Sequence, residues 1–163
     1  MIEIRDTQGK VIKRVDSADL RGADLSGAAL CGAKGINKYL TTPLYVLQDQ
    51  PGAIHAYKLV NSCGEGIYRG GIKYEVGATL TVDAWNEDES ESCGSGINLA
   101  TLDWCLREWQ EGYQILICEF TKEDIVAIPF GSDGKFRVKR CKVIAEKPLT
   151  ELGWPTKIKG TAS

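Results

Sequence analysis

Histidine is nearly absent from this chain of 163 residues, with His55 as its single imidazole. No two cysteines are spaced as CxxC, and one histidine cannot build a Cys2His2 zinc site. Only a site of four thiolates from scattered cysteines stays open. No apolar run approaches the roughly 20 residues that cross a membrane as a helix. A net charge of only −2 does not indicate binding to nucleic acid or to an anionic membrane.

The N-terminal segment also does not have the pattern of a signal peptide, because MIEIRDTQGK has no basic segment followed by an apolar one. We therefore expect a cytoplasmic protein. Its six cysteines, at positions 31, 63, 93, 105, 118 and 141, are then expected to be reduced thiols. We expect neither a cofactor nor a metal.

A short repeat begins at Ala18 and reads ADLRG, ADLSG, AALCG and then AKG. One small and one large apolar residue in each unit are typical of a solenoid, in which both point inward. The repeat resembles the pentapeptide-repeat family, whose fold is a right-handed β-helix with four units per coil. Three good units make less than one coil, and a solenoid rung is buried only by its neighbours. We expect this stub to pack against other parts of the chain, and we do not expect it to bind as an imitation of DNA.

The chain is expected to form three parts: residues 1–36, a β-hairpin around the DTQG turn plus the repeat stub; residues 37–147, an α+β domain; and residues 148–163, an extended arm. In the central part, one main helix after Thr101 is expected to end near Gly112 and to cover an antiparallel or mixed sheet. Alternating apolar residues predict strands at 44–48, 53–60, 72–76, 78–85, 114–120, 125–130 and 136–145. The alternation of the last strand slips near Lys139, which predicts a bulge there.

Two nearly identical hexamers, SCGEGI at 62–67 and SCGSGI at 92–97, are thirty positions apart. Gly-x-Gly lets the backbone turn sharply and approach another group closely. A phosphate-binding loop would need a following helix and a lysine at a fixed offset, and both hexamers lack them. A cysteine nucleophile would need a base, and His55 lies in a strand-like segment. We favour turns that shape a recess, with a reactive cysteine as the alternative.

The residues expected to bind a ligand surround these turns. The segment KFRVKRCK carries five basic residues in eight, and it predicts either a solvated face on an edge strand or a patch for phosphates. Trp104 is expected either to stack on a base beside Tyr68 or to be buried. The acidic segment NEDESE is expected to be a flexible loop. The expected ligand-binding set is Tyr68, Arg69, Gly70, Gly94, Gly96, Asn98, Trp104, Arg137 and Lys139.

From Tyr68 onward the sequence resembles an uncharacterised domain that follows pentapeptide repeats in bacteriophage and bacterial proteins. This resemblance implies a phage or prophage setting, and hence the cytoplasm of the host cell. A fainter resemblance is to the ADP-ribosyltransferases, in which a Tyr-(His/Arg)-Gly strand and a Gly-x-Gly strand grip NAD. Residues 68–70 and 94–96 match these two motifs, while Ile97 and Asn98 stand where that family has an aromatic residue. The resemblance implies a catalytic glutamate, for which Glu119 and Glu123 are the candidates.

Three functions follow from these patterns. The first is a phage-type accessory protein without catalytic activity that captures a host protein or a nucleotide-like ligand, to counter a host defence. The second is an ADP-ribosyltransferase-like enzyme that uses NAD. The third is a structural or assembly protein that forms homo-oligomers. An open, partly apolar recess between Tyr68, Asn98 and the basic strand would favour a small ligand, and a filled one would favour protein contacts.

Overall fold

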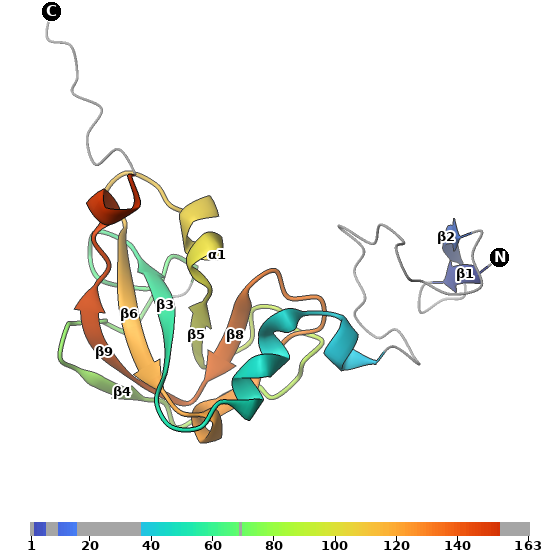
Figure 1. Ribbon diagram of the computed structural model, residues 1–163, viewed down its shortest axis with the longest axis horizontal. Coiled ribbons are helices and arrows are strands. Elements are labelled where there is room, and N and C mark those ends of the chain that lie inside the picture. The colour runs from blue at the N-terminus through green and yellow to red at the C-terminus, as the bar shows by residue number, and fades with distance from the viewer. Residues whose placement is uncertain (1, 6–9, 16–36, 69, 154–163) are drawn as a thin grey trace, which may run out of the picture.

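The structure is a computed structural model that describes residues 2–5, 10–15, 37–68 and 70–153 (Figure 1). The DTQG turn, Arg69, the 16–36 segment with the repeat stub and the end of the 148–163 arm lie outside the described residues. Within those ranges, no helix is both long enough and apolar enough to cross a membrane.

The predicted N-terminal hairpin is present as a two-stranded sheet of its own. Strands β1 (Ile2–Arg5) and β2 (Val11–Val15) are antiparallel, with Ile2 opposite Val15. An exposed ion pair joins the two strands, since Arg14 Nε lies 3.0 Å from Glu3 Oε1.

The second sheet has seven described strands in the order β4-β9-β6-β3-β5-β8-β7, and every pairing in it is antiparallel (Figure 1). A single α-helix, α1, accompanies the described part of this sheet, so the α+β prediction is compatible with the fold at that coarse level. The strands are β3 (Ile54–Val60), β4 (Thr79–Thr81), β5 (Ile97–Ala100), β6 (Gln114–Phe120), β7 (Ile125–Ala127), β8 (Lys135–Val138) and β9 (Arg140–Glu146).

The segment predicted as one bulged strand is two strands with different partners. Strand β8 pairs with β5 and β7, whereas β9 pairs with β4 and β6, and Lys139 alone separates them. In a flat sheet β8 and β9 would be about 19 Å apart, at about 4.8 Å per strand. Val138 and Arg140 are only two residues apart, so the sheet must curl until these strands meet. Figure 1 shows the strands converging at this junction and spreading away from it.

Helical segments differ from the prediction in two places. The prediction of a strand at 44–48 is wrong, because this segment lies in the 3-10 helix η2 (Pro43–Asp49). Pro43 suits the first helical position, and the Thr42 side chain caps the Leu44 amide. Helix α1 (Leu102–Arg107) starts after Thr101 as predicted but ends five residues before Gly112. Further 3-10 helices are η1 (Lys38–Leu40), η3 (Lys122–Asp124) and η4 (Leu149–Leu152), the last lying in the predicted extended arm.

The predicted strand at 72–76 is a loop. Its only ladder contact is an isolated bridge between Glu65 and Lys73, and the Tyr74 amide donates to the carbonyl of Gly64. Of the alternating apolar residues that predicted a strand, Tyr74 is buried but Val76 is 60% exposed. The chain here folds back on the first SCGxGI turn instead of joining the sheet.

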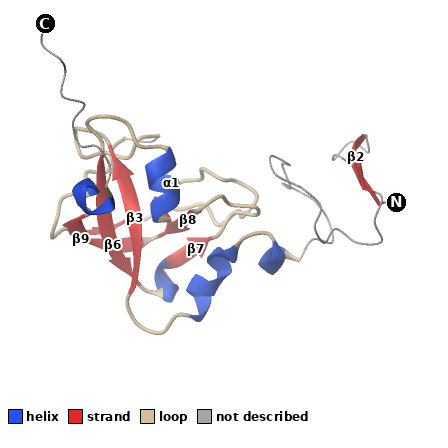
Figure 2. Ribbon diagram, turned by 45° about the horizontal axis from the view of Figure 1, so that its top comes forward, coloured by secondary structure: helices blue, strands red, loops and turns tan. Residues whose placement is uncertain are grey.

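The sheet separates two apolar clusters. Alternate residues of β3 (Ile54, Ala56 and Val60) belong to the larger cluster, together with Phe120, Phe136 and Val143. Leu59 points to the opposite side and packs with α1, which lies beside β3 in Figure 2. The smaller cluster is made of Leu59, Ala100, Trp104, Cys105 and Ile115. Lys58 occupies a position on the same side of β3 as the larger cluster.

Candidate ligand pocket

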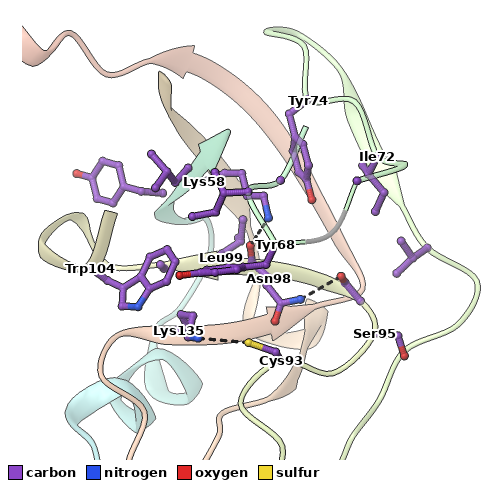
Figure 3. A pocket seen from close by; sticks show the side chains of 18 of the residues that line it. Lys58, Tyr68, Ile72, Tyr74, Cys93, Ser95, Asn98, Leu99, Trp104 and Lys135 are labelled. Carbon is purple, nitrogen blue, oxygen red and sulfur yellow. Dashed lines mark hydrogen bonds between the residues drawn. The ribbon is translucent and has the colours of Figure 1, made fainter. Parts of the chain in front are cut away.

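A pocket of about 450 Å³ opens where β3 and β5 part. Strand β3 pairs along all seven of its residues with β6, but it pairs with β5 only at Tyr57 and Ala100. The separation of β3 from β5 beyond this pair leaves a space that side chains border but do not fill (Figure 3). The volume lies in the range of small-molecule sites. The walls are Tyr57, Lys58, Leu59, Gly66, Ile67, Tyr68, Gly70, Ile72, Tyr74, Val82, Ala84, Cys93, Ser95, Gly96, Asn98, Leu99, Ala100, Trp104 and Lys135.

Both SCGxGI turns border this pocket. The first contributes Gly66 and Ile67, and the second contributes Cys93, Ser95 and Gly96. The backbones differ in detail, because the positive φ falls on Gly64 (79°) in the first turn and on Gly96 (125°) in the second. Their resemblance in sequence therefore reflects a shared place at one recess rather than one repeated backbone shape.

Lys58 brings a positive charge into the pocket wall. Its Nζ donates to the main-chain carbonyl of Asn98 at 2.9 Å, across the gap between β3 and β5, and lies 4.8 Å from the centre of the Tyr74 ring. No carboxylate of the described residues forms an ion pair with it. Burial lowers the pKa of Lys58 to about 8, although three nearby thiols act in the opposite direction.

Aromatic rings and a second lysine form the mouth of the pocket. The rings of Tyr68 and Trp104 lie 6.3 Å apart, and Lys135 Nζ lies 5.8 and 5.3 Å from their centres. The Tyr68 hydroxyl donates to Glu108 at 2.5 Å, and this hydrogen bond is the main reason that the pKa of Tyr68 rises to about 12. Lys135 Nζ also lies 3.4 Å from Cys93 Sγ, as Figure 3 shows.

Asn98 offers a hydrogen-bond acceptor in the same wall. Its Nδ2 donates to the carbonyls of Gly94 and Gly96 at 3.2 and 3.4 Å, which fixes the orientation of the amide. The other amide atom, Oδ1, is buried and has no hydrogen-bond partner in the described part of the chain. A buried acceptor without a partner is costly, and a ligand N–H or O–H would satisfy it.

The structure brings together five of the nine residues expected to bind a ligand and places three elsewhere. Tyr68, Gly70, Gly96, Asn98 and Trp104 line the pocket. Gly94, Arg137 and Lys139 do not line it, and Arg69 lies outside the described residues. Trp104, for which stacking and burial were both open, is buried to 6% exposure with one side toward the pocket.

Arg137 holds the acidic loop in place. Its side chain is fully buried, and it donates to the main-chain carbonyls of Asn86 (2.9 Å), Asp88 (2.5 Å) and Glu91 (2.5 Å). The prediction of an edge strand for the basic segment is wrong, since β8 lies between β5 and β7 and β9 between β4 and β6, although Arg140 and Lys142 of β9 are exposed. Gly94 packs on this guanidinium, because a Cβ there would lie only 3.0 Å from Arg137 Cζ.

The remaining charged candidates lie away from the pocket. Lys139 Nζ lies 6.0 Å from the centre of the Trp85 ring. Glu119 pairs with His55 across β6 and β3 at 3.3 Å, and neither Glu119 nor Glu123 lines the pocket. Among the described wall residues there is thus no carboxylate to act as the glutamate that an ADP-ribosyltransferase would use.

Lys58 and Lys135 are the charged residues of the pocket wall that sequence reasoning missed. Lys58 could have been found from the alternation of β3. It lies on the same side of the strand as Ile54, Ala56 and Val60, and it is the one charged residue on that side. Lys135 was counted in the basic segment, but nothing in the sequence links it to Tyr68. Its approach to the rings depends on the pairing of β8 with β5.

The described thiols form two groups. Cys63 and Cys93 are exposed, whereas Cys105, Cys118 and Cys141 are buried, and all five are free. Burial raises the pKa of Cys105 to about 12, and a hydrogen bond with Cys141 together with burial raises the pKa of Cys118. Within the described part of the chain, no three potential metal ligands cluster.

Taken together, the geometry is that of a pocket with cationic groups, aromatic rings and one acceptor without a partner among the described residues. Comparisons with family models, with curated proteins and with solved structures found no match to this chain. The resemblances to pentapeptide-repeat proteins and to ADP-ribosyltransferases therefore stay predictions, and the functional argument depends on the pocket.

Proposed function

We propose that this protein binds a small anionic ligand of nucleotide-like size in the pocket between β3 and β5. The observation that carries the proposal is Lys58, whose ammonium lies in the pocket wall without a carboxylate partner among the described residues. An ammonium removed from water without a counter-ion destabilises the folded protein. An anionic ligand would supply the missing charge and gain from the low dielectric of the site.

The rest of the pocket supports a ligand with both planar and polar parts. Tyr68 and Trp104 present rings at the mouth, where a base or another flat group can stack. Asn98 Oδ1 would accept a hydrogen bond from a ligand donor. Small-molecule binding is favoured over capture of a host protein because the recess is open and largely apolar. The phage-type resemblance implies that such binding would serve to counter a host defence.

Isothermal titration calorimetry with mononucleotides and cyclic nucleotides tests the proposal. At least one should bind with a Kd below about 100 μM, and Lys58→Met should weaken it at least about tenfold, or about 1.4 kcal/mol. Lys122→Met is the matched control, because Lys122 is exposed in η3 and away from the pocket. Absence of binding below about 1 mM by the wild type, or equal loss in both variants, would reject the proposal.

A further inference from the structure

The position of Lys58 differs from that of an ordinary lysine. It projects from the side of β3 that carries Ile54, Ala56 and Val60, and Leu99 and Tyr74 share its pocket. The titratable groups that influence its pKa are the thiols of Cys105, Cys118 and Cys141 rather than carboxylates. An amine in such surroundings is half-buried, and it is reached through the mouth of the pocket.

Burial has a chemical consequence for this amine. With a pKa of about 8, roughly a quarter of the Lys58 side chains are neutral at pH 7.5, against about one in a thousand for an ordinary lysine. A neutral amine has a lone pair and is a nucleophile, as in lysines desolvated in apolar pockets. Because one N–H of Lys58 is donated to the Asn98 carbonyl, the nitrogen is also held in a fixed place.

We propose that Lys58 forms a reversible imine with a small aldehyde that carries an anionic group. The Nζ lone pair attacks the carbonyl carbon, and the C=O electron pair moves to oxygen. One proton passes from nitrogen to that oxygen and gives a carbinolamine. Loss of water then forms the C=N bond, so that amine plus aldehyde gives imine plus water. This inference rests on the proposed function, since it assigns the ligand class of the same pocket.

The rest of the pocket suits such a ligand. Lys135 Nζ stands at the mouth, between Cys93 and the rings of Tyr68 and Trp104, where it can meet an anionic group. The rings can pack on a flat aldehyde. Among the described residues that line the pocket there is no aspartate or glutamate, and the Glu108 carboxylate beside the mouth is engaged by the Tyr68 hydroxyl.

Trapping with pyridoxal 5′-phosphate and borohydride tests the inference on the full-length protein. This probe combines an aromatic aldehyde with a phosphate, and borohydride reduces its imine to a stable secondary amine. Peptide mapping by mass spectrometry should place the label on Lys58 at least ten times more often than on exposed Lys122. The rate of labelling at Lys58 should level off above about pH 8, whereas that at Lys122 should still rise toward pH 10.

Two further measurements separate this inference from the proposed function. Lys58→Arg keeps the charge, so it should lose the specific label and retain binding of the alcohol analogue pyridoxine 5′-phosphate. Label distributed over surface lysines without preference for Lys58 in the wild type would overturn the inference, whatever the variant does. Binding of the alcohol without imine formation would overturn it while the proposed function stands, and binding of neither compound would count against both.

Discussion

The ammonium of Lys58 lies 4.8 Å from the centre of the Tyr74 ring, and no carboxylate of the described residues pairs with it. Lys58→Met should therefore raise the free energy of unfolding at pH 7. The pKa falls from 10.5 to about 8 on folding, which corresponds to a penalty of about 3 kcal/mol. Loss of the hydrogen bond to Asn98 offsets part of it, so the net gain should be about 1–2 kcal/mol.

The same substitution makes a prediction about pH. The pKa of Lys58 is lower in the folded state than in the unfolded state. The destabilisation of the folded protein by the Lys58 charge is therefore full below pH 8 and is lost as pH rises toward 10.5. The advantage of Lys58→Met over the wild type should shrink by about 2 kcal/mol between pH 7 and pH 9.5. Urea denaturation at both pH values measures it, with Lys122→Met as control. A difference that does not change with pH would contradict the lowered pKa.

Arg137→Met should destabilise the protein by about 2–4 kcal/mol, because it removes the donors that hold the carbonyls of Asn86, Asp88 and Glu91. Arg140→Met, two residues after the end of β8 on the exposed side of β9, should change stability by less than about 0.5 kcal/mol. Chemical denaturation compares the two variants. Similar small losses in both would show that Arg137 does not support the acidic loop.

Gly94→Ala should cost about 1–3 kcal/mol, because its Cβ would lie 2.9 Å from Asn86 Cβ and 3.0 Å from Arg137 Cζ. At Gly70 the nearest atom to a new Cβ is the carboxylate oxygen of Glu65, at the end of a side chain that can turn away. Gly70→Ala is therefore expected to cost clearly less. Thermal unfolding of both variants decides this, and an equal or larger loss at Gly70 would be the contrary result.

The exposed thiols should react in the native protein before the buried ones. Iodoacetamide is expected to modify Cys63 and Cys93 rapidly, and Cys105, Cys118 and Cys141 only on unfolding, because burial keeps these three thiols out of reach. A pocket ligand should slow the reaction of Cys93 and leave that of Cys63 unchanged, since Cys93 alone of the two lines the pocket. Peptide mapping at timed intervals measures all five. Equal protection of both exposed thiols would argue against the assigned pocket.

Strong alternation and turn residues were enough to predict part of the fold. The hairpin and strands β3 and β6 follow their apolar pattern, and the helix begins after Thr101. The slip in alternation at Lys139 was correctly located but interpreted as a bulge, because a single sequence does not show which partners a strand takes on either side. Residues 44–48 misled the prediction because a proline and a capping threonine outweighed their strand-like composition.

Residues of the pocket were predictable only where turn chemistry marked them. Gly96 and Asn98 stood out through the SCGSGI hexamer, and Tyr68 through the hexamer before it. The role of Lys58 in the pocket was overlooked because the residue lies within a predicted strand. Its place on the same side of that strand as Ile54, Ala56 and Val60 could nevertheless have been predicted. Lys135 and Arg137 look alike in a basic segment and share one face of β8 by alternation. They differ because the loop of Asn86, Asp88 and Glu91 covers Arg137, whereas Lys135 lies at the mouth of the pocket.

The close succession of β8 and β9, with only Lys139 between them, also determines when the domain can complete its folding during synthesis. Strand β4 has its partner in β9, and β5 depends on β8 for all but one of its residue pairs. On a ribosome these earlier strands therefore wait until residues 135–146 emerge, and one continuous stretch then closes both flanks of the sheet. Contacts that span so much of the chain slow folding, so the cleft between β3 and β5 should acquire its final shape late.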